Sequence, residues 1–201
     1  MLREAAFDEV FDSQATFRAL LEALSRPGMI AVLPPCAYES VPPGFCASML
    51  SILKTLCDHR VSFSVGSSEN TSGWVGYLDV NLSTPFRAIA EAAYVIFEGD
   101  RFDEDFQHLN RGTLEFPETS ATALLCVRNL RENPGAEERV LHLSGPGVQD
   151  GTRLCVDGLH PRYLEERARA NRFFPLGIDL FLVDHAGNVA GIPRTSIITA
   201  D

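Results

Sequence analysis

Residues 173–183 read FFPLGIDLFLV, and residues 184–195 continue with DHAGNVAGIPRT. The apolar, β-prone run at 178–183 lies between turn-forming residues, and the Asp/Gly/Asn cluster that follows reverses the chain into a second apolar run. This pattern predicts a buried β-hairpin. The exception to the apolar pattern is Asp179, which falls inside the first strand.

A carboxylate in a buried strand costs several kcal/mol unless it is paired, so we expect a cationic partner for Asp179. If Val183 faces Ala190, counting outward places Arg194 opposite that carboxylate, in reach of a cross-strand ion pair. A slip of one residue would place Pro193 there instead. We therefore expect Asp179 and Arg194 to form a structural ion pair.

The composition favours a single domain over residues 1–201. The chain has 201 residues, of which 45% are hydrophobic, and a formal net charge of -10 that opposes nucleic-acid or anionic-membrane partners. No apolar run approaches the length of a bilayer span, and the acidic N-terminal residues lack the apolar core of a signal peptide. The odd set of cysteines without CxxC spacing indicates reduced thiols and a cytoplasmic location: Cys36, Cys46, Cys57, Cys126 and Cys155.

Predicted helices and strands alternate through residue 110, and strands joined by short turns follow. Asp12 or Ser13 caps the first predicted helix, which ends at Pro27. This order predicts an α/β protein with a three-layer α/β/α architecture around a mixed β-sheet. The other predicted helices cover 45–57, 74–82, 103–110 and 161–172, and the strands outside the hairpin cover 29–33, 61–65, 93–97, 121–128 and 139–143.

The sequence carries no recognisable catalytic or metal-binding motif. Its five histidines lack the spacing of a zinc site, and GxSxG, Walker A and GxGxxG motifs are absent. The GPG segment at 145–147 is best explained as a tight turn, with a backbone nest for an anion as the alternative. Arg26 lies in the last turn of the first predicted helix, where the helix dipole favours a cation. We expect no metal site, and the sequence leaves open whether the chain has an active site of its own.

Two motifs near the C-terminus are the most specific in the chain, FPLGID at 174–179 and PRT at 193–195. Shorter ones precede them in a fixed order: DSQ at 12–14, FR at 17–18, LL at 20–21, RPG at 26–28, LKTLCD at 53–58, AT at 121–122 and LSGPG at 143–147. Together they resemble the PhnH family, whose members are subunits of the bacterial carbon-phosphorus (C-P) lyase machinery, and the resemblance covers about residues 7–199.

This resemblance implies an α/β/α fold related to that of pyridoxal-phosphate (PLP)-dependent transferases, without the cofactor or its lysine. It also implies a homodimer that assembles with the G, I and J subunits into a core complex. With an ATP-binding subunit, that machinery exchanges the adenine of ATP for an alkylphosphonate and yields ribose 1-alkylphosphonate 5-triphosphate. The family supplies no agreed catalytic residue to carry over.

On this basis we expect an accessory subunit of the C-P lyase complex in organic phosphonate catabolism. It would support the formation of α-D-ribose 1-methylphosphonate 5-triphosphate from ATP and methylphosphonate. The alternative is a transferase subunit that binds phosphonate or nucleotide directly, with Arg26, Arg194 and Thr195 as anion ligands. A structural domain outside phosphonate metabolism is a third hypothesis.

The cofactor question can be addressed from the residues themselves. PLP requires a lysine for its Schiff base, and Lys54 is the single lysine of the chain. At about 100° per residue, Lys54 falls on the side of its predicted helix opposite the apolar face that contains Met49 and Leu53. We therefore expect Lys54 to face solvent and the protein to bind no PLP.

Overall fold

The computed structural model describes residues 7–67, 70–133, 139–148 and 151–200. Its centre is a six-stranded mixed sheet. Strands β2, β3, β4 and β8 are parallel to one another, β9 is antiparallel to β8, and β1 is antiparallel to β9. The expected mixed sheet of an α/β protein is therefore confirmed. In spatial order the strands are β1 (Ile30–Val32), β9 (Asn188–Ile192), β8 (Asp179–Val183), β4 (Thr122–Cys126), β3 (Tyr94–Glu98) and β2 (Phe63–Val65).

A second, four-stranded antiparallel sheet was not expected from the sequence. Of its strands, only β6 matches a predicted strand, because β5 and β10 are very short and polar side chains interrupt β7. Such segments become strands through pairing with neighbours rather than through their own propensity. In spatial order they are β10 (Ile197–Ala200), β6 (Arg139–Ser144), β7 (Thr152–Asp157) and β5 (Asn129–Arg131).

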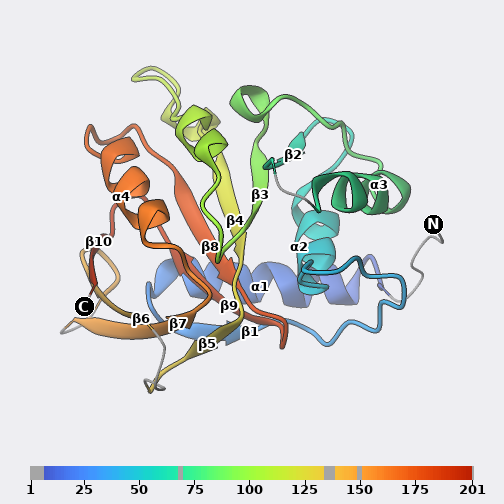
Figure 1. The fold of residues 1–201 in the computed structure, drawn as a ribbon, viewed down its shortest axis with the longest axis horizontal. Helices are drawn as coiled ribbons and strands as arrows, with labels where there is room; N and C mark the ends of the chain where they lie inside the picture. The colour runs from blue at the N-terminus through green and yellow to red at the C-terminus, as the bar shows by residue number, and fades with distance from the viewer. Residues whose placement is uncertain (1–6, 68–69, 134–138, 149–150, 201) are drawn as a thin grey trace.

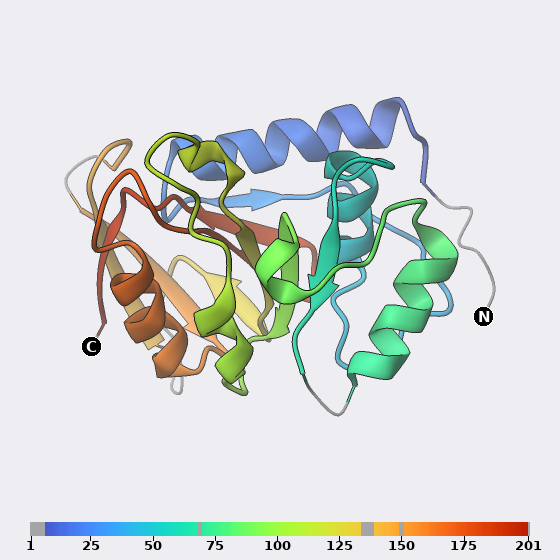
Figure 2. The ribbon, with the colours of Figure 1, turned by 90° about the horizontal axis from the view of Figure 1, so that it is seen from above.

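Helices cover one face of the six-stranded sheet, and the second sheet together with α4 covers the other (Figures 1 and 2). The α/β/α expectation is thus correct for the first face and incomplete for the second. None of the helices in the described ranges has the length and apolarity needed to cross a membrane. The α-helices are α1 (Phe11–Ser25), α2 (Ser48–Leu56), α3 (Thr71–Asn81) and α4 (Pro161–Ala170), and the 3-10 helices are η1 (Ile89–Glu91), η2 (Glu104–His108) and η3 (Pro117–Thr119).

Strand β8 shows why the run at 178–183 is continuously apolar. Leu180 and Leu182 face the core shared with the second sheet and α4, whereas Phe181 and Val183 face the core shared with α1, α2 and α3. All four side chains are buried. Since successive side chains of a strand point to opposite faces, a strand covered on both faces loses the usual apolar/polar alternation.

Two helix predictions need correction. Neither Asp12 nor Ser13 caps α1: the N-cap position is Val10, and Asp8 Oδ1 just upstream accepts the backbone N–H groups of Val10 and Phe11 at 2.9 and 2.8 Å. Asp12 instead accepts the backbone N–H of Asp8 at 2.9 Å, which closes a reciprocal cap. The helix expected over 103–110 is the 3-10 helix η2.

Candidate functional site

The β8–β9 hairpin forms with a register one residue away from the expected one. Val183 lies opposite Val189, rather than opposite Ala190. Counting outward from this pair therefore places Pro193, and not Arg194, level with Asp179. The expected register is wrong, and the alternative slip is the one that the chain adopts.

The loop between the two strands sets this register. The backbone N–H of Asp184 donates to the carbonyl oxygen of Asn188 at 3.0 Å. Oδ1 of the same buried aspartate accepts the N–H groups of Ala186 and Asn188, each at 2.9 Å, and Oδ2 accepts the N–H of Leu130 at 3.1 Å. The carboxylate thus fixes a short Asx-type turn and joins it to β5.

Asp179 and Arg194 form an ion pair in spite of the shifted register. Arg194 Nη2 lies 2.6 Å from Asp179 Oδ2, and the backbone N–H of Arg194 donates to Asp179 Oδ1 at 2.7 Å. Strand β9 ends at Ile192, and the turn that follows, closed by the N–H of Ser196 on the carbonyl of Pro193, brings Arg194 back to the start of β8. The contact therefore depends on a turn rather than on ladder pairing.

All five N–H donors of the Arg194 guanidinium are used within the protein. Besides Asp179, its nitrogens donate to the carbonyl oxygens of Pro117 and Pro175 at 2.9 and 3.3 Å and to the hydroxyl of Ser120. The Arg194 side chain is only 16% exposed. An anion would have to displace one of these bonds to reach Arg194, so the geometry assigns this residue to the wall of the site.

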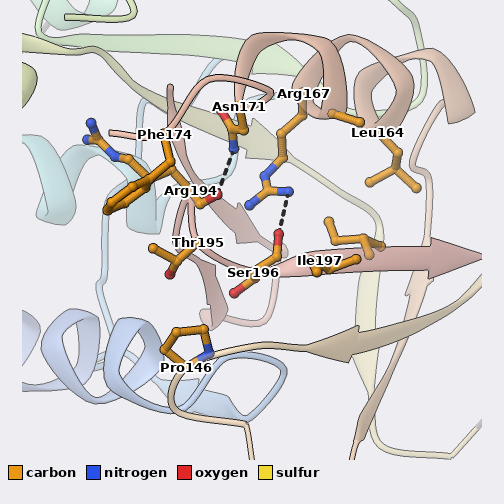
Figure 3. Close-up of a pocket in the computed structure, with 11 residues that line it drawn as sticks. Pro146, Leu164, Arg167, Asn171, Phe174, Arg194, Thr195, Ser196 and Ile197 are labelled. Carbon is orange, nitrogen blue, oxygen red and sulfur yellow. Dashed lines mark hydrogen bonds between the residues drawn. The ribbon is translucent and has the colours of Figure 1, made fainter. Parts of the chain in front are cut away.

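A cavity of about 580 Å³ lies beside this turn, between α4 and the segment that leads into β10 (Figure 3). Its size falls within the range of small-molecule sites in proteins. Figure 3 shows residues from α4 along one side and residues 194–197 along the other, with Pro146 of the 145–147 turn opposite. Its wall comprises Pro146, Leu164, Arg167, Ala168, Asn171, Phe174, Arg194, Thr195, Ser196, Ile197 and Ile198.

The charged group in this cavity that the sequence reasoning missed is Arg167. It is 2% exposed, and its terminal nitrogens donate to the carbonyl oxygens of Pro193 and Ser196 at 2.5 and 3.2 Å. Burial lowers the pKa of Arg167 to about 10, and the nearby charge of Asp179 opposes this shift only in part. Glu166 lies next to it in sequence but pairs with Arg169, at 2.6 Å. The predicted helix over 161–172 contains four arginines, and no local pattern separates the buried Arg167 from the other three: Arg162, Arg169 and Arg172.

The three anion-binding candidates do not meet in one place. Thr195 lines the cavity, and Arg194 lies in its wall. Arg26 follows the end of α1, is 64% exposed and pairs with Glu22 at 3.2 Å, outside the cavity lining. The 145–147 segment makes a turn, in which the N–H of residue 148 donates to the carbonyl of residue 145 at 3.1 Å.

A second candidate site lies at the carboxyl ends of the parallel strands, the edge at which open α/β sheets commonly bind ligands. Glu98 ends β3 and Cys126 ends β4, and both line a cavity of about 280 Å³ together with Asn70, Arg128 and His185. The sequence analysis did not single out these residues. The sequence feature that could have indicated this site is the polar residue at the end of each predicted strand.

The thiols of Cys46 and Cys126 at this edge take part in hydrogen bonds with the backbone. The backbone N–H of Cys46 donates to Cys126 Sγ at 3.3 Å, and Cys46 Sγ donates to the carbonyl of Val183 at 3.3 Å. The hydrogen bond to Cys126 and burial raise the pKa of Cys46, so this thiol stays protonated at neutral pH. Among the residues that the structure describes, no group of three or more His, Cys, Asp or Glu side chains is placed to hold a metal ion.

The expectation that Lys54 faces solvent is wrong. Its ammonium lies 5.5 Å from the ring centroid of Phe7 and 5.7 Å from that of Tyr38. It lines a cavity of about 310 Å³ that also contains Glu9 and Asp58. The helical projection failed because it takes no account of Phe7 and Tyr38, whose rings approach this side of α2 in the folded chain.

Comparison with known proteins assigns the family. The sequence model described as "Bacterial phosphonate metabolism protein (PhnH)" matches residues 5–199. The chain belongs to the PhnH family. One relative, from Stutzerimonas stutzeri, is named "Putative C-P lyase subunit protein HtxG" and is 32% identical over 185 residues, which cover 92% of this chain and 85% of that protein.

A second relative comes from Rhizobium meliloti (strain 1021). It is named "Alpha-D-ribose 1-methylphosphonate 5-triphosphate synthase subunit PhnH" and is 29% identical over 192 residues, or 94% of this chain and 91% of that protein. Each alignment covers at least 92% of this chain and at least 85% of the relative.

Proposed function

We propose that this PhnH-family chain is an accessory subunit of a C-P lyase complex in phosphonate catabolism. In that role it supports the formation of α-D-ribose 1-methylphosphonate 5-triphosphate from ATP and methylphosphonate. The relatives that cover most of the chain carry names of this complex and of this synthase, which supports the proposal. The structural observation that carries it is an exposed apolar surface on α1.

This surface, the α1 stripe, consists of Val10, Phe11, Phe17 and Leu21, which are 70%, 73%, 52% and 56% exposed. Val10, Phe17 and Leu21 recur at helical spacing, so they lie along one side of the helix. Large apolar side chains grouped on a protein surface mark contact sites, because burying them against a partner removes apolar area from water. An accessory subunit works through such a surface.

The proposed partners are a second copy of the chain and the G, I and J subunits. We expect Phe17→Glu to reduce co-purification with these subunits at least severalfold, because it places a charge within the α1 stripe. Leu114→Glu is the matched control, since Leu114 is an exposed apolar residue (76%) outside α1. Equal recovery of wild type, Phe17→Glu and Leu114→Glu with the three subunits would refute a role for the stripe. Failure of the wild type to associate with them would refute the accessory function itself.

We also propose that the protein acts without PLP, whatever its fold relationship to PLP-dependent transferases. The surroundings of Lys54 fit the cofactor poorly, since the described residues that line its cavity include Glu9 and Asp58 but no arginine to hold a phosphate group. Absorbance spectra of the purified protein with added PLP test this point. We expect no internal-aldimine band, and a band that Lys54→Ala abolishes would overturn the proposal.

The single domain over 1–201 and the cytoplasmic location remain part of this proposal. A C-P lyase accessory subunit would meet ATP and its partner subunits in the cytoplasm. Fractionation of cells grown on methylphosphonate as the phosphorus source tests the location, with recovery in the cytoplasmic fraction as the expected result.

A further inference from the structure

The largest cavity described above has a wall that is partly apolar and partly cationic, which suits a ligand that is part apolar and part anionic. Leu164, Phe174 and Ile197 supply its apolar wall, and Arg167 supplies a guanidinium. In Figure 3 the Arg167 side chain extends from α4 into the ring of wall residues, toward Ser196, whereas the Arg194 side chain points away from it. The two arginines therefore have different roles, although both line the cavity.

Arg167 is a buried cation without an ion-pair partner among the described residues. Its hydrogen bonds go to the neutral carbonyls of Pro193 and Ser196, and its Nε has no acceptor. The nearby carboxylates are already taken, because Asp179 pairs with Arg194 and Glu166 pairs with Arg169. A buried charge is costly unless an opposite charge compensates it, so the cavity wall carries one positive charge that an anion would neutralise.

Two residues with hydroxyl groups follow Arg194 in the wall of the cavity. Ser196 Oγ is buried and has no hydrogen-bond partner, and Thr195 lines the same stretch of wall. The side-chain amide of Asn171, in contrast, is used internally, since it donates to the carbonyls of Ile178 and Arg194 at 3.1 and 3.4 Å. The guanidinium and the hydroxyls together match the oxygens of a single oxyanion group.

We propose that this cavity binds a small organic oxyanion, with its phosphonate, phosphate or carboxylate head at Arg167, Thr195 and Ser196 and its short apolar chain against Leu164 and Ile197. One buried arginine balances about one negative charge, so a nucleoside triphosphate is a poor ligand for this site. The inference goes beyond the accessory function, because it rests on the cavity of the isolated chain and not on its assembly into a complex.

Titration calorimetry on the purified full-length chain tests the proposal with four probes: propylphosphonate, inorganic phosphate, butyrate and propylammonium. We expect propylphosphonate or butyrate to bind and propylammonium to give no heat. Tighter binding of propylphosphonate than of butyrate assigns a phosphonate head, and the reverse assigns a carboxylate. Preference for inorganic phosphate over both alkyl anions would overturn the apolar part of the proposal, and no binding by any anion would overturn it entirely.

Variants locate the site. Arg167→Met keeps the length of the side chain but removes the charge, and it should weaken binding at least about tenfold. Leu164→Trp fills the cavity without touching the guanidinium and should weaken binding to a similar degree, which keeps the test valid if Arg167→Met folds poorly. Arg153→Met is the charge-matched control, because Arg153 is exposed on β7 outside the cavity. Wild-type affinity in both Arg167→Met and Leu164→Trp would place the ligand elsewhere and refute the proposal.

Discussion

At the scale of single residues, buried and half-buried charges in this protein are held by different kinds of partner. Asp179 has a salt bridge, Asp184 has backbone and amide N–H donors, and Arg167 has backbone carbonyls. The first two arrangements satisfy a carboxylate with donors from neighbouring turns. The third leaves a cation without a counter-charge in the described part of the chain, and this difference separates a structural charge from a candidate binding group.

Removing the Asp179 carboxylate should be costly. Asp179→Ala removes the counter-charge of Arg194 and the acceptor of its backbone N–H, its Nε and one Nη2 hydrogen, and we expect a loss of unfolding free energy on the order of 3 kcal/mol. Asp157→Ala is the control, since Asp157 pairs with the mostly exposed Arg128 and should cost less than about 1 kcal/mol. Urea denaturation measures both values. Equal midpoints for wild type and Asp179→Ala would show that the pair does not stabilise the fold.

Cys57 should make the protein less stable in alkali. Burial, together with the charge of Asp58, raises the pKa of Cys57 from 9.0 to about 12. The folded chain then keeps a proton that the unfolded chain has released, so stability present below pH 9.0 is lost as the pH rises toward about 12.

Thermal melts between about pH 8 and 10.5 measure this loss, which for one group has a slope of at most about 1.4 kcal/mol per pH unit. We expect Cys57→Ala to reduce the slope of the unfolding free energy against pH. Cys36→Ala, which also removes one thiol, is the matched control. An unchanged slope in Cys57→Ala would assign the alkaline loss to other groups.

At the scale of elements, the position of α1 depends on how closely its backbone approaches β9. Gly191 lies where a Cβ would come within 2.8 Å of the carbonyl carbon of Ala23 and the nitrogen of Leu24. These are backbone atoms of a packed helix and cannot move aside singly. The glycine therefore fixes the contact between α1 and the centre of the sheet, and with it the orientation of the α1 stripe.

Gly191→Ala should push α1 away from β9 and lower the free energy of unfolding by about 1–3 kcal/mol. Gly73→Ala in α3 is the matched control, because no atom lies within 4 Å of its added Cβ. Alanine favours helices over glycine by about 1 kcal/mol, so this control should leave stability unchanged or raise it. Wild-type stability in Gly191→Ala would mean that α1 is not held by this contact.

At the scale of the whole molecule, the six-stranded sheet couples two apolar cores. Trp74 of α3 is buried in the core on one face, and Tyr163 of α4 is buried in the core on the other. Because β8 contributes side chains to both, neither core should unfold alone.

We therefore expect one cooperative transition in urea. Fluorescence of Trp74, the single tryptophan of the chain, reports the first core, and hydrogen exchange of the α4 amides reports the second. Coincident midpoints are the expected result. Separate midpoints would show that the second sheet and α4 form an independent folding unit.

The local pattern of the sequence was sufficient for much of this fold. Continuous apolar runs identified the parallel strands, and the Pro-Gly signal located the end of α1, because strand burial and helix termination depend on neighbouring residues. The same reasoning found the family motifs and the partnership of Asp179 with Arg194, since a buried carboxylate requires a cation. Local patterns did not predict the strands β5, β7 and β10, because pairing with neighbouring strands, rather than the propensity of their own residues, makes them strands.

The sequence by itself determined the mixed α/β class, the PhnH membership and the need for a charge partner at Asp179. Only the tertiary structure decided the register of the hairpin, the fully bonded state of the Arg194 guanidinium and the burial of Arg167 beside a cavity. The physical reason is the distance along the sequence over which each effect acts. Propensity and periodicity depend on a few neighbouring residues, whereas the environment of a charge depends on segments that meet only after folding. The proposed anion site therefore shares its cavity with Arg194 but centres on Arg167, an arginine that no local pattern distinguishes.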